Sequence, residues 1–252
     1  MKRIMAVVLA SSLSLAASAS AQAGAGAPRD AAGWTSLFNG RDLSGWRVPA
    51  GDNGHWKVVN GVIDYDAQSE APGEKHLWSE REYRDFTLRL DWRIKEYAGL
   101  YPIPNVRPDG TEETGPDGKV ITTPRPNADS GIYLRGTDKA QVNIWAWPIG
   151  SGEVYGYRTD TKMPAAVRAG VTPKVNADRP VGEWNAMEIT MRGDRLTVVL
   201  NGQTVIENAQ LPGVPAAGRL ALQHHGGRRA DGTLDPASSL VQFRNIQIRE
   251  LP

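Results

Sequence analysis

The chain has 252 residues and an almost balanced charge, with 29 Lys and Arg against 28 Asp and Glu. No long run of one charge occurs, which argues against binding to nucleic acid or to an anionic membrane surface. The sequence has no cysteine, so it has neither disulfides nor a cysteine for lipidation, and packing alone must stabilise it. A neutral or nearly neutral small ligand is therefore expected.

The first 23 residues have the pattern of a secretory signal peptide. Lys2 and Arg3 precede an apolar run over 4–15, and Ala21 and Ala23 are small residues at signal-peptidase spacing. The apolar run is too short to cross a bilayer, which argues against a retained membrane anchor. The sequence therefore predicts removal of residues 1–23 and a periplasmic or secreted protein.

Residues 24–30 are small, polar and Pro-containing, and they predict a disordered leader. The remaining residues, 31–252, have a length at which one all-β sandwich is a reasonable single domain. A domain of this size buries enough surface to stand without disulfides.

Two Asn-Gly pairs predict tight β-hairpins, because each lies between two apolar-rich runs. The pairs are Asn60-Gly61 and Asn201-Gly202. Apolar and polar residues alternate with period two over 86–94, 187–191 and 241–249, which indicates strands with one buried face. No segment has a convincing helical stripe of useful length. The predicted fold is all-β, with two packed antiparallel sheets in a sandwich.

Two stretches interrupt this pattern of strands. Residues 97–128 are crowded with Pro and Gly, and residues 150–180 have mixed propensity and include Tyr155. Long insertions in compact domains are often binding loops, so both are expected near the ligand, with Tyr155 among the binding residues. The alternative is that they are plain surface loops.

The aromatic composition is skewed, with eight Trp against three Phe. Trp has a flat apolar face and a polar N–H, which suit the C–H faces and the hydroxyl groups of a sugar. The alternative is that most of these indoles lie in the core.

Strand alternation places several polar side chains on one face of a sheet. Asp129, Tyr133 and Arg135 share a face that offers a carboxylate, a phenol and a guanidinium, although an internal Asp129–Arg135 ion pair is the alternative. On the next strand Gln141, Asn143 and Trp145 share a face, and amides beside an indole predict a sugar-binding surface.

Three further residues are candidates for the chemistry. Glu153 lies in a Gly-rich turn, where a carboxylate has no packing purpose, and it is an acid/base group, a metal ligand or a solvated turn residue. His225 and its neighbour His224 end a predicted strand before Gly226. A His at this place is a base, a ligand or a surface residue. The predicted catalytic set is Glu153, His225 and Asp129, with His224 among the binding residues.

A series of blocks in the right order gives the chain a resemblance to a known family. The opening Gly33-Trp34-Thr35-Ser36-Leu37-Phe38-Asn39-Gly40 resembles the start of the 3-keto-disaccharide hydrolase domain, and the match spans essentially the whole mature chain. The later blocks that agree are 56–63, 85–93, 129–135, 141–144, 152–156, 182–185, 218–226 and 243–246. The resemblance implies a concanavalin A-like, laminin G-like jelly roll, and an enzyme that hydrolyses sugars already oxidised at C3.

A ketone at C3 explains how such an enzyme differs from an ordinary glycosidase. It makes the C2 proton acidic, so a base removes that proton, the enolate expels the aglycone from C1, and water adds afterwards. The enolate oxygen then needs either a bound divalent cation or converging hydrogen-bond donors. A conventional mechanism would use two carboxylates instead. The sequence does not choose between these routes.

The chain departs from its relatives at two positions that bear on a cation. Many relatives carry a carboxylate where Gln141 stands and an Asp where His224 stands. Any metal ligands, and the need for a divalent cation, therefore stay open.

Two other classes of function remain possible at this point. The same sandwich with aromatic faces could be a non-catalytic carbohydrate-binding module of the cell envelope, since fold does not decide function. It could also be a structural sandwich without a small ligand. The sequence does not indicate the natural substrate, its linkage or the oligomeric state.

Overall fold

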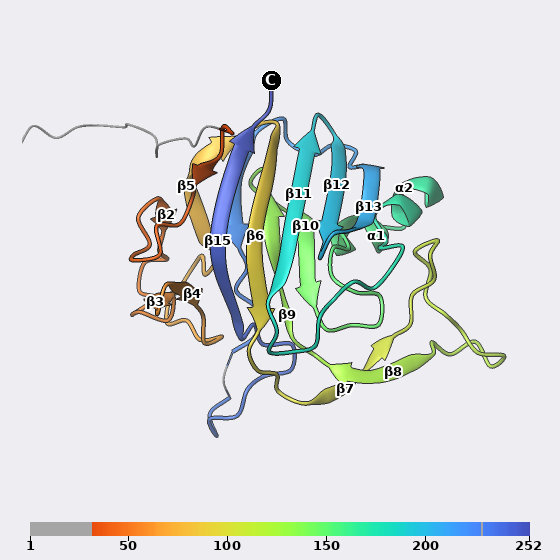
Figure 1. Cartoon of the computed structure of the whole chain (residues 1–252). Coiled ribbons are helices and arrows are strands. Elements are labelled where there is room, and N and C mark those ends of the chain that lie inside the picture. The colour runs from red at the N-terminus through yellow and green to blue at the C-terminus, as the bar shows by residue number, and fades with distance from the viewer. Residues whose placement is uncertain (1–31, 228) are drawn as a thin grey trace, which may run out of the picture.

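The computed structural model describes residues 32–252 except residue 228. The predicted signal peptide and leader lie outside these residues. Two antiparallel sheets pack face to face and contain most of the strands in the described chain (Figure 1). The predicted two-sheet β-sandwich is therefore confirmed.

The larger sheet has eight strands and includes both predicted hairpins. Its order is β13 (Gln203–Gln210), β12 (Arg195–Leu200), β11 (Asn185–Arg192), β6 (Phe86–Ile94), β15 (Val241–Glu250), β4 (Val62–Asp64) and β3 (Lys57–Val59), with β1 (Thr35–Ser36) paired to β15. The hairpin turns have positive φ at Asn60 (50°), Gly61 (79°), Asn201 (52°) and Gly202 (81°). Two successive positive φ angles are what a type I′ turn requires, which is why Asn-Gly occurs at both.

The smaller sheet has five strands and carries the candidate site. Its order is β10 (Thr137–Trp145), β9 (Asp129–Leu134), β14 (Gly218–Leu222), β5 (Leu77–Tyr83) and β2 (Trp46–Arg47). Successive strands in this order are antiparallel throughout.

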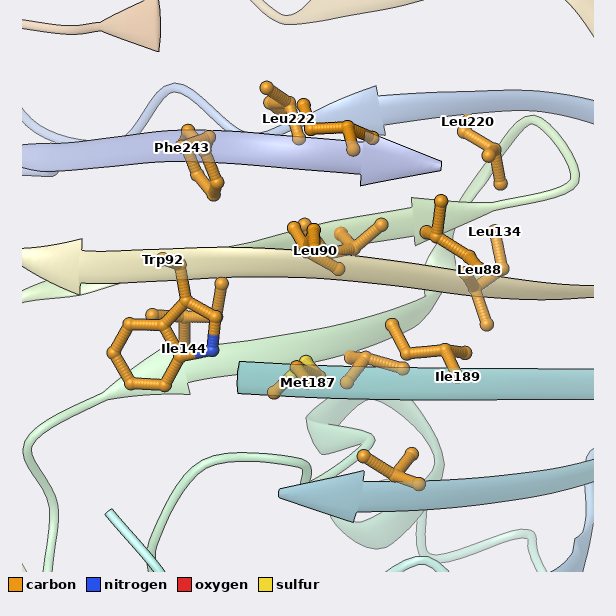
Figure 2. Close-up of a cluster of buried hydrophobic side chains, with 14 of the residues drawn as sticks. Leu88, Leu90, Trp92, Leu134, Ile144, Met187, Ile189, Leu220, Leu222 and Phe243 are labelled. Atoms are coloured by element: carbon orange, nitrogen blue, oxygen red, sulfur yellow. The ribbon is translucent and has the colours of Figure 1, made fainter. Parts of the chain in front are cut away.

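The core fills the space between the two sheets (Figure 2). From the larger sheet, Leu88, Leu90 and Trp92 of β6 point inward and are 1–2% exposed. From the smaller sheet, Leu134 and Leu222 meet them. Full burial of such side chains stabilises the fold by about 1.5–3 kcal/mol each. Side chains alternate along a strand. In the smaller sheet, the residues next to Leu134 and Leu222 in the sequence therefore face outward, away from the core.

The two stretches expected to be irregular contain short regular elements. Residues 97–128 include β7 (Leu100–Pro104) and β8 (Thr122–Pro126), which form a separate hairpin that projects at one end of the sandwich (Figure 1). Proline is tolerated there because a two-stranded sheet consists of edge strands. Residues 150–180 include α1 (Tyr155–Arg158), against β10, and α2 (Ala165–Gly170), against β13. Both helices are too short for a periodic stripe to reveal them.

None of the helices in the described part of the chain is long and apolar enough to span a membrane.

Candidate active site

A straight row of residues crosses the outer face of the five-stranded sheet, one residue from each strand. Strand register places Arg47 opposite Trp78, Trp78 opposite Ala221, Ala221 opposite Tyr133, and Tyr133 opposite Gln141. Ala221 has the smallest side chain of the row, and the rings of Trp78 and Tyr133 approach to 5.9 Å between centroids on either side of it. We call these five residues the aromatic row.

Two further rows of paired residues lie toward the N-terminal end of β9, before Tyr133. Asn143 is opposite Gly131, whose carbonyl accepts the backbone N–H of Gln223 at 2.9 Å. Trp145 is opposite Asp129. Asp129, Tyr133, Gln141 and Asn143 therefore lie on one face of the sheet, as the alternation predicted.

A chain of hydrogen bonds links two amides to the phenol of Tyr133. Gln141 Nε2 donates to Gln223 Oε1, and Gln223 Nε2 donates to the Tyr133 hydroxyl oxygen at 3.1 Å. This direction leaves the phenol proton for another acceptor. Burial raises the pKa of Tyr133 to about 12, so the proton stays on the phenol at neutral pH. Tyr133 is thus a neutral hydrogen-bond donor on this face.

Gly131 makes the amide chain possible. A Cβ at this position would clash with the Gln141 side chain and would lie 2.8 Å from the carbonyl oxygen of Val142. Only the bare backbone of glycine leaves Gln141 room to reach across β9 to Gln223.

Asp129 and His225 lie side by side at one end of this face. Asp129 Oδ2 lies 3.8 Å from His225 Nε2, and Asp129 Oδ1 is buried without a hydrogen-bond partner. Burial raises the pKa of Asp129 to about 6, and the nearby His225 and a hydrogen bond from Asn143 oppose this rise. The structure therefore brings together two of the three predicted catalytic residues.

The backbone around His225 fixes its orientation. His225 Nδ1 lies 2.8 Å from the carbonyl oxygen of Ala237, so Nδ1 carries the proton that it donates there. The backbone N–H of His225 donates to Ser239 Oγ at 2.7 Å. In the neutral ring, Nε2 then has a lone pair directed to the side of Asp129. Its side chain is 40% exposed, so a ligand can reach it.

His224 lies beside the site in a more buried place than its neighbour. Its Nδ1 shares a hydrogen bond with the hydroxyl of Tyr65, a ring that stacks on Trp56 at 4.0 Å. Its backbone N–H donates to Nδ1 of His76 at 3.1 Å. Burial, aided by neighbouring positive groups, lowers the pKa of His224 to about 4, so this imidazole is neutral at neutral pH. These contacts favour a supporting role over direct substrate binding.

Arg135 has a different environment from the one predicted. It follows β9 in a turn with φ of 50°, at the opposite end from Asp129, and it is 2% exposed. Its guanidinium donates to the carbonyl oxygens of Arg84, Gly193 and Pro215 and pairs with Asp85 at 2.8 Å. The Asp129–Arg135 ion pair is therefore not formed, and the hydrogen bonds of Arg135 connect loops.

Of the two aromatic residues expected to bind the ligand beside the amides, Trp145 is buried and Tyr155 is exposed. Trp145 is 1% exposed, its indole N–H donates to the Gly150 carbonyl at 2.7 Å, and its ring stacks on Trp147 at 4.1 Å. The predicted exposed face of Trp145 is therefore covered. Tyr155 is 44% exposed, and its ring meets Trp145 edge-on at 6.2 Å.

Glu153 is neither a solvated turn residue nor an open catalytic carboxylate. It is completely buried, and its Oε1 is ion-paired with Nε of Arg158 in α1. Its backbone carbonyl accepts the N–H of Asn143 at 2.9 Å, which attaches the turn to the edge of β10. The Glu153 carboxylate is therefore engaged with Arg158 inside the protein, whereas Asp129 and His225 lie on the outer face of the sheet.

Three residues of this face were not among the predictions: His76, Trp78 and Gln223. His76 and Trp78 alternate at the start of β5, and Gln223 directly follows β14. Alternation over 76–78 and 219–223 could have found them, because Leu77, Leu220 and Leu222 are apolar and buried between them.

A metal site is not apparent among the residues that the structure describes. In that part of the chain, no group of three or more His, Asp and Glu side chains lies close enough together to hold a metal ion.

A family model described as the 3-keto-alpha-glucoside-1,2-lyase-like domain matches residues 33–249. The chain belongs to this family. The resemblance seen in the sequence is thus confirmed, and it covers nearly all of the described residues. Membership of the 3-keto-alpha-glucoside-1,2-lyase-like family places the protein among proteins named for carbohydrate chemistry.

Two crystal structures from Parabacteroides distasonis, each described as that of a candidate glycosyl hydrolase, are similar to the chain. One is 21% identical, with a TM-score of 0.53, and the match covers 87% of this chain and 84% of that one. The other is 20% identical, also with a TM-score of 0.53, and covers 88% and 95%. At this identity the likeness shows the fold alone. No curated protein matches the chain.

Proposed function

We propose that the protein is an exported enzyme that cleaves 3-keto-glycosides by elimination across C1 and C2, followed by addition of water. The observation that carries the proposal is the Asp129–His225 pair on the outer face of the five-stranded sheet. The description of the family as lyase-like supports elimination as the first step.

In the first step His225 takes the C2 proton of the substrate. Its Nε2 lone pair accepts the proton, the C2–H electrons form an enolate with the C3 ketone, and Asp129 stabilises the imidazolium that results. The enolate then re-forms the ketone, a C1=C2 double bond forms, and the C1–O bond breaks. The leaving oxygen takes the proton from the imidazolium of His225 and departs as an alcohol, which regenerates the neutral base. Water finally adds its oxygen to C1 and a proton to C2.

The enolate oxygen needs hydrogen-bond donors near the site of proton removal. The amide of Gln223 lies between the Asp129 row and the aromatic row, and the Tyr133 phenol retains a proton to donate. Asn143 and Gln141 complete a polar surface that suits the substrate hydroxyls.

The direct test is incubation of the purified protein with 3-keto-trehalose, with and without a chelator, followed by NMR detection of released glucose. His225→Ala and Asp129→Asn are expected to lower kcat by about 10²–10⁴, because each removes part of the proton-transfer pair. His55→Ala is the matched control, since His55 pairs with Asp66 instead.

Circular dichroism of each variant establishes that it is folded. Unchanged turnover in both site variants would remove the assignment of the pair. Saturable binding of the 3-keto sugar without any turnover would instead favour a carbohydrate-binding module.

Export is the part of the proposal that concerns the first 23 residues, and it rests on their charged, apolar and small-residue pattern. Expression of the full chain in a Gram-negative host, with mass spectrometry of the periplasmic fraction, is expected to give a protein that begins at Gly24. An unprocessed chain that stays in the cytoplasm would contradict it.

A further inference from the structure

A pocket of about 340 Å³ lies at the end of the sandwich where β6 and β10 finish, beside the β7–β8 hairpin (Figure 1). Trp92 of β6, Trp145 of β10 and Pro126 of β8 line it, and we call it the end pocket. Its described lining includes neither Asp129 nor His225. Volumes of about 300–1,000 Å³ are typical of sites for small ligands. The end pocket therefore has room for a small molecule away from the proposed catalytic pair.

Aromatic rings and prolines supply the apolar part of the lining. The ring of Trp147 stacks on that of Trp145 at 4.1 Å, and the Trp147 indole N–H donates to Asn127 Oδ1 at 3.3 Å. These contacts fix the indole, and because Trp147 is only half-buried, part of its surface is left for a ligand. Pro126 and Pro180 add rigid apolar surface from β8 and from the loop before β11. Flat, rigid walls of this kind suit a planar apolar ring.

Two guanidinium groups and one carboxyl group supply the charges of the end pocket, namely those of Arg125, Arg179 and Asp178. The Arg179 side chain donates to the carbonyl oxygen of Trp184 at 3.2 Å. In the part of the chain that the structure describes, neither guanidinium is paired with a carboxylate. A guanidinium presents its N–H groups in a planar fork that matches a carboxylate. The two arginines therefore leave positive charge at the pocket for an anionic ligand.

Asp178 opposes this positive charge less than an ordinary aspartate does. One of its oxygens accepts the backbone N–H of Ser151, and the other is buried without a partner among the described residues. Burial raises the pKa of this carboxyl to about 6. An anion bound in the pocket raises this pKa further, and the protonated acid has no charge to repel the anion. Anion binding is thus coupled to proton uptake by Asp178.

Other classes of small ligand match these groups less well. An ammonium group would meet two guanidinium groups whose charge no carboxylate offsets. A neutral alcohol would gain nothing from that charge. A carboxylate attached to an aromatic ring uses both parts of the lining, because its ring meets the apolar walls and its oxygens accept from the arginines.

We propose that the end pocket is a binding site for a small aromatic carboxylate, with the ring against Trp147 and the carboxylate held by Arg125 and Arg179. The inference does not rest on the proposed function, because it concerns a different part of the molecule and is tested by binding alone.

The test is isothermal titration calorimetry of the full chain with three probes that share a phenyl ring: phenylacetate, phenethyl alcohol and phenethylamine. Phenylacetate is expected to bind at a single saturable site, and the alcohol about tenfold more weakly, which is the equivalent of one charge-assisted contact. Arg125→Gln is expected to weaken phenylacetate binding by a similar factor. Arg192→Gln is the matched control, because Arg192 is exposed at the far end of β11 from the pocket residue Asn185.

Asp178→Asn gives a second, opposite readout. At about pH 8 this variant is expected to bind phenylacetate several-fold more tightly than the wild type, because the amide carries no negative charge. The wild-type affinity is expected to rise several-fold between about pH 8 and about pH 5.5, and that of the variant to stay nearly constant. Weaker binding by Asp178→Asn would contradict the proposal.

Three further results would overturn the assignment. The first is the absence of saturable phenylacetate binding to the wild-type protein. The second is tighter binding of phenethylamine than of phenylacetate, which would make the pocket a site for cations. The third is an equal effect of Arg125→Gln and Arg192→Gln, which would place the carboxylate outside the end pocket.

Discussion

The carboxyl group of Asp178 is buried in a place where its negative charge is unfavourable. One oxygen accepts the backbone N–H of Ser151 at 2.8 Å, and the other is buried without a partner. Burial raises its pKa to about 6, against an ordinary value of 3.8. A folded-state pKa above the unfolded value means that stability is full below the unfolded pKa and is lost as the pH rises through about 6.

Asp178→Asn is therefore expected to stabilise the protein near neutral pH, because the amide resembles the protonated acid. A shift of about two pKa units corresponds to a gain of up to about 3 kcal/mol at about pH 7, and to almost none at about pH 4. Urea denaturation of both proteins at the two pH values measures the difference. A variant less stable than the wild type at both would mean that the carboxylate is satisfied in the folded state.

The pH dependence of catalysis follows from Asp129. Because burial raises its pKa to about 6, protonation on the acid side removes the negative charge that stabilises the imidazolium of His225. The value of kcat/KM is expected to fall as the pH drops through about 6. The Asp129→Asn variant should keep a low activity whose acid limb is displaced from that of the wild type. An acid limb unchanged in the variant would assign it to another group.

At this scale the sequence predicted which residues share a face, but not their partners. Alternation placed Asp129, Tyr133, Gln141 and Asn143 correctly, since strand geometry alone fixes the face. The sequence did not predict Arg158 as the partner of Glu153. Arg158 lies in a short helix, and a helix of that length gives no periodic pattern in the sequence. The same applies to Arg135, whose partners come from three distant loops.

Among the elements, the close packing of β14 against the β9–β10 turn depends on Gly218. A Cβ at this position would clash with the carbonyl group of Arg135, whose backbone cannot move aside without disturbing its buried network. Gly218→Ala is expected to cost about 1–3 kcal/mol as an overpacking change.

Gly73→Ala is the matched control, because no atom lies within 4 Å of the added Cβ and φ is not positive there. Denaturant midpoints of the two variants measure the comparison. Equal midpoints for the two variants would show that β14 and the β9–β10 turn can move apart without a loss of stability.

The long strands were predictable, and the short ones were not. β6, β11 and β15 have enough residues for alternation to be clear, and the hairpins of β3–β4 and β12–β13 contain Asn-Gly turns. The two-residue strands β1 and β2 exist because of their partners β15 and β5. The hairpin of β7 and β8 is rich in proline. Because proline is disfavoured in strands, sequence patterns do not predict a strand there.

For the whole molecule, the placement of the last two strands matters most. β14 lies between β5 and β9. β15 lies between β4 and β6 (Figure 1), so both sheets close around segments from the final fifth of the chain. A chain that ends at residue 217 is expected to show no cooperative unfolding transition. Circular dichroism during heating tests this, and a sharp transition would contradict it.

Until β14 and β15 arrive, the edges of β4, β5, β6 and β9 remain unpaired and open to association with other chains. Assembly must therefore wait for contacts of very large sequence separation, which predicts refolding on the slow, millisecond-to-second side of single-domain kinetics. The same delay would keep an emerging polypeptide unfolded until its synthesis is nearly complete, which is the state that the proposed export through a narrow protein-conducting pore requires.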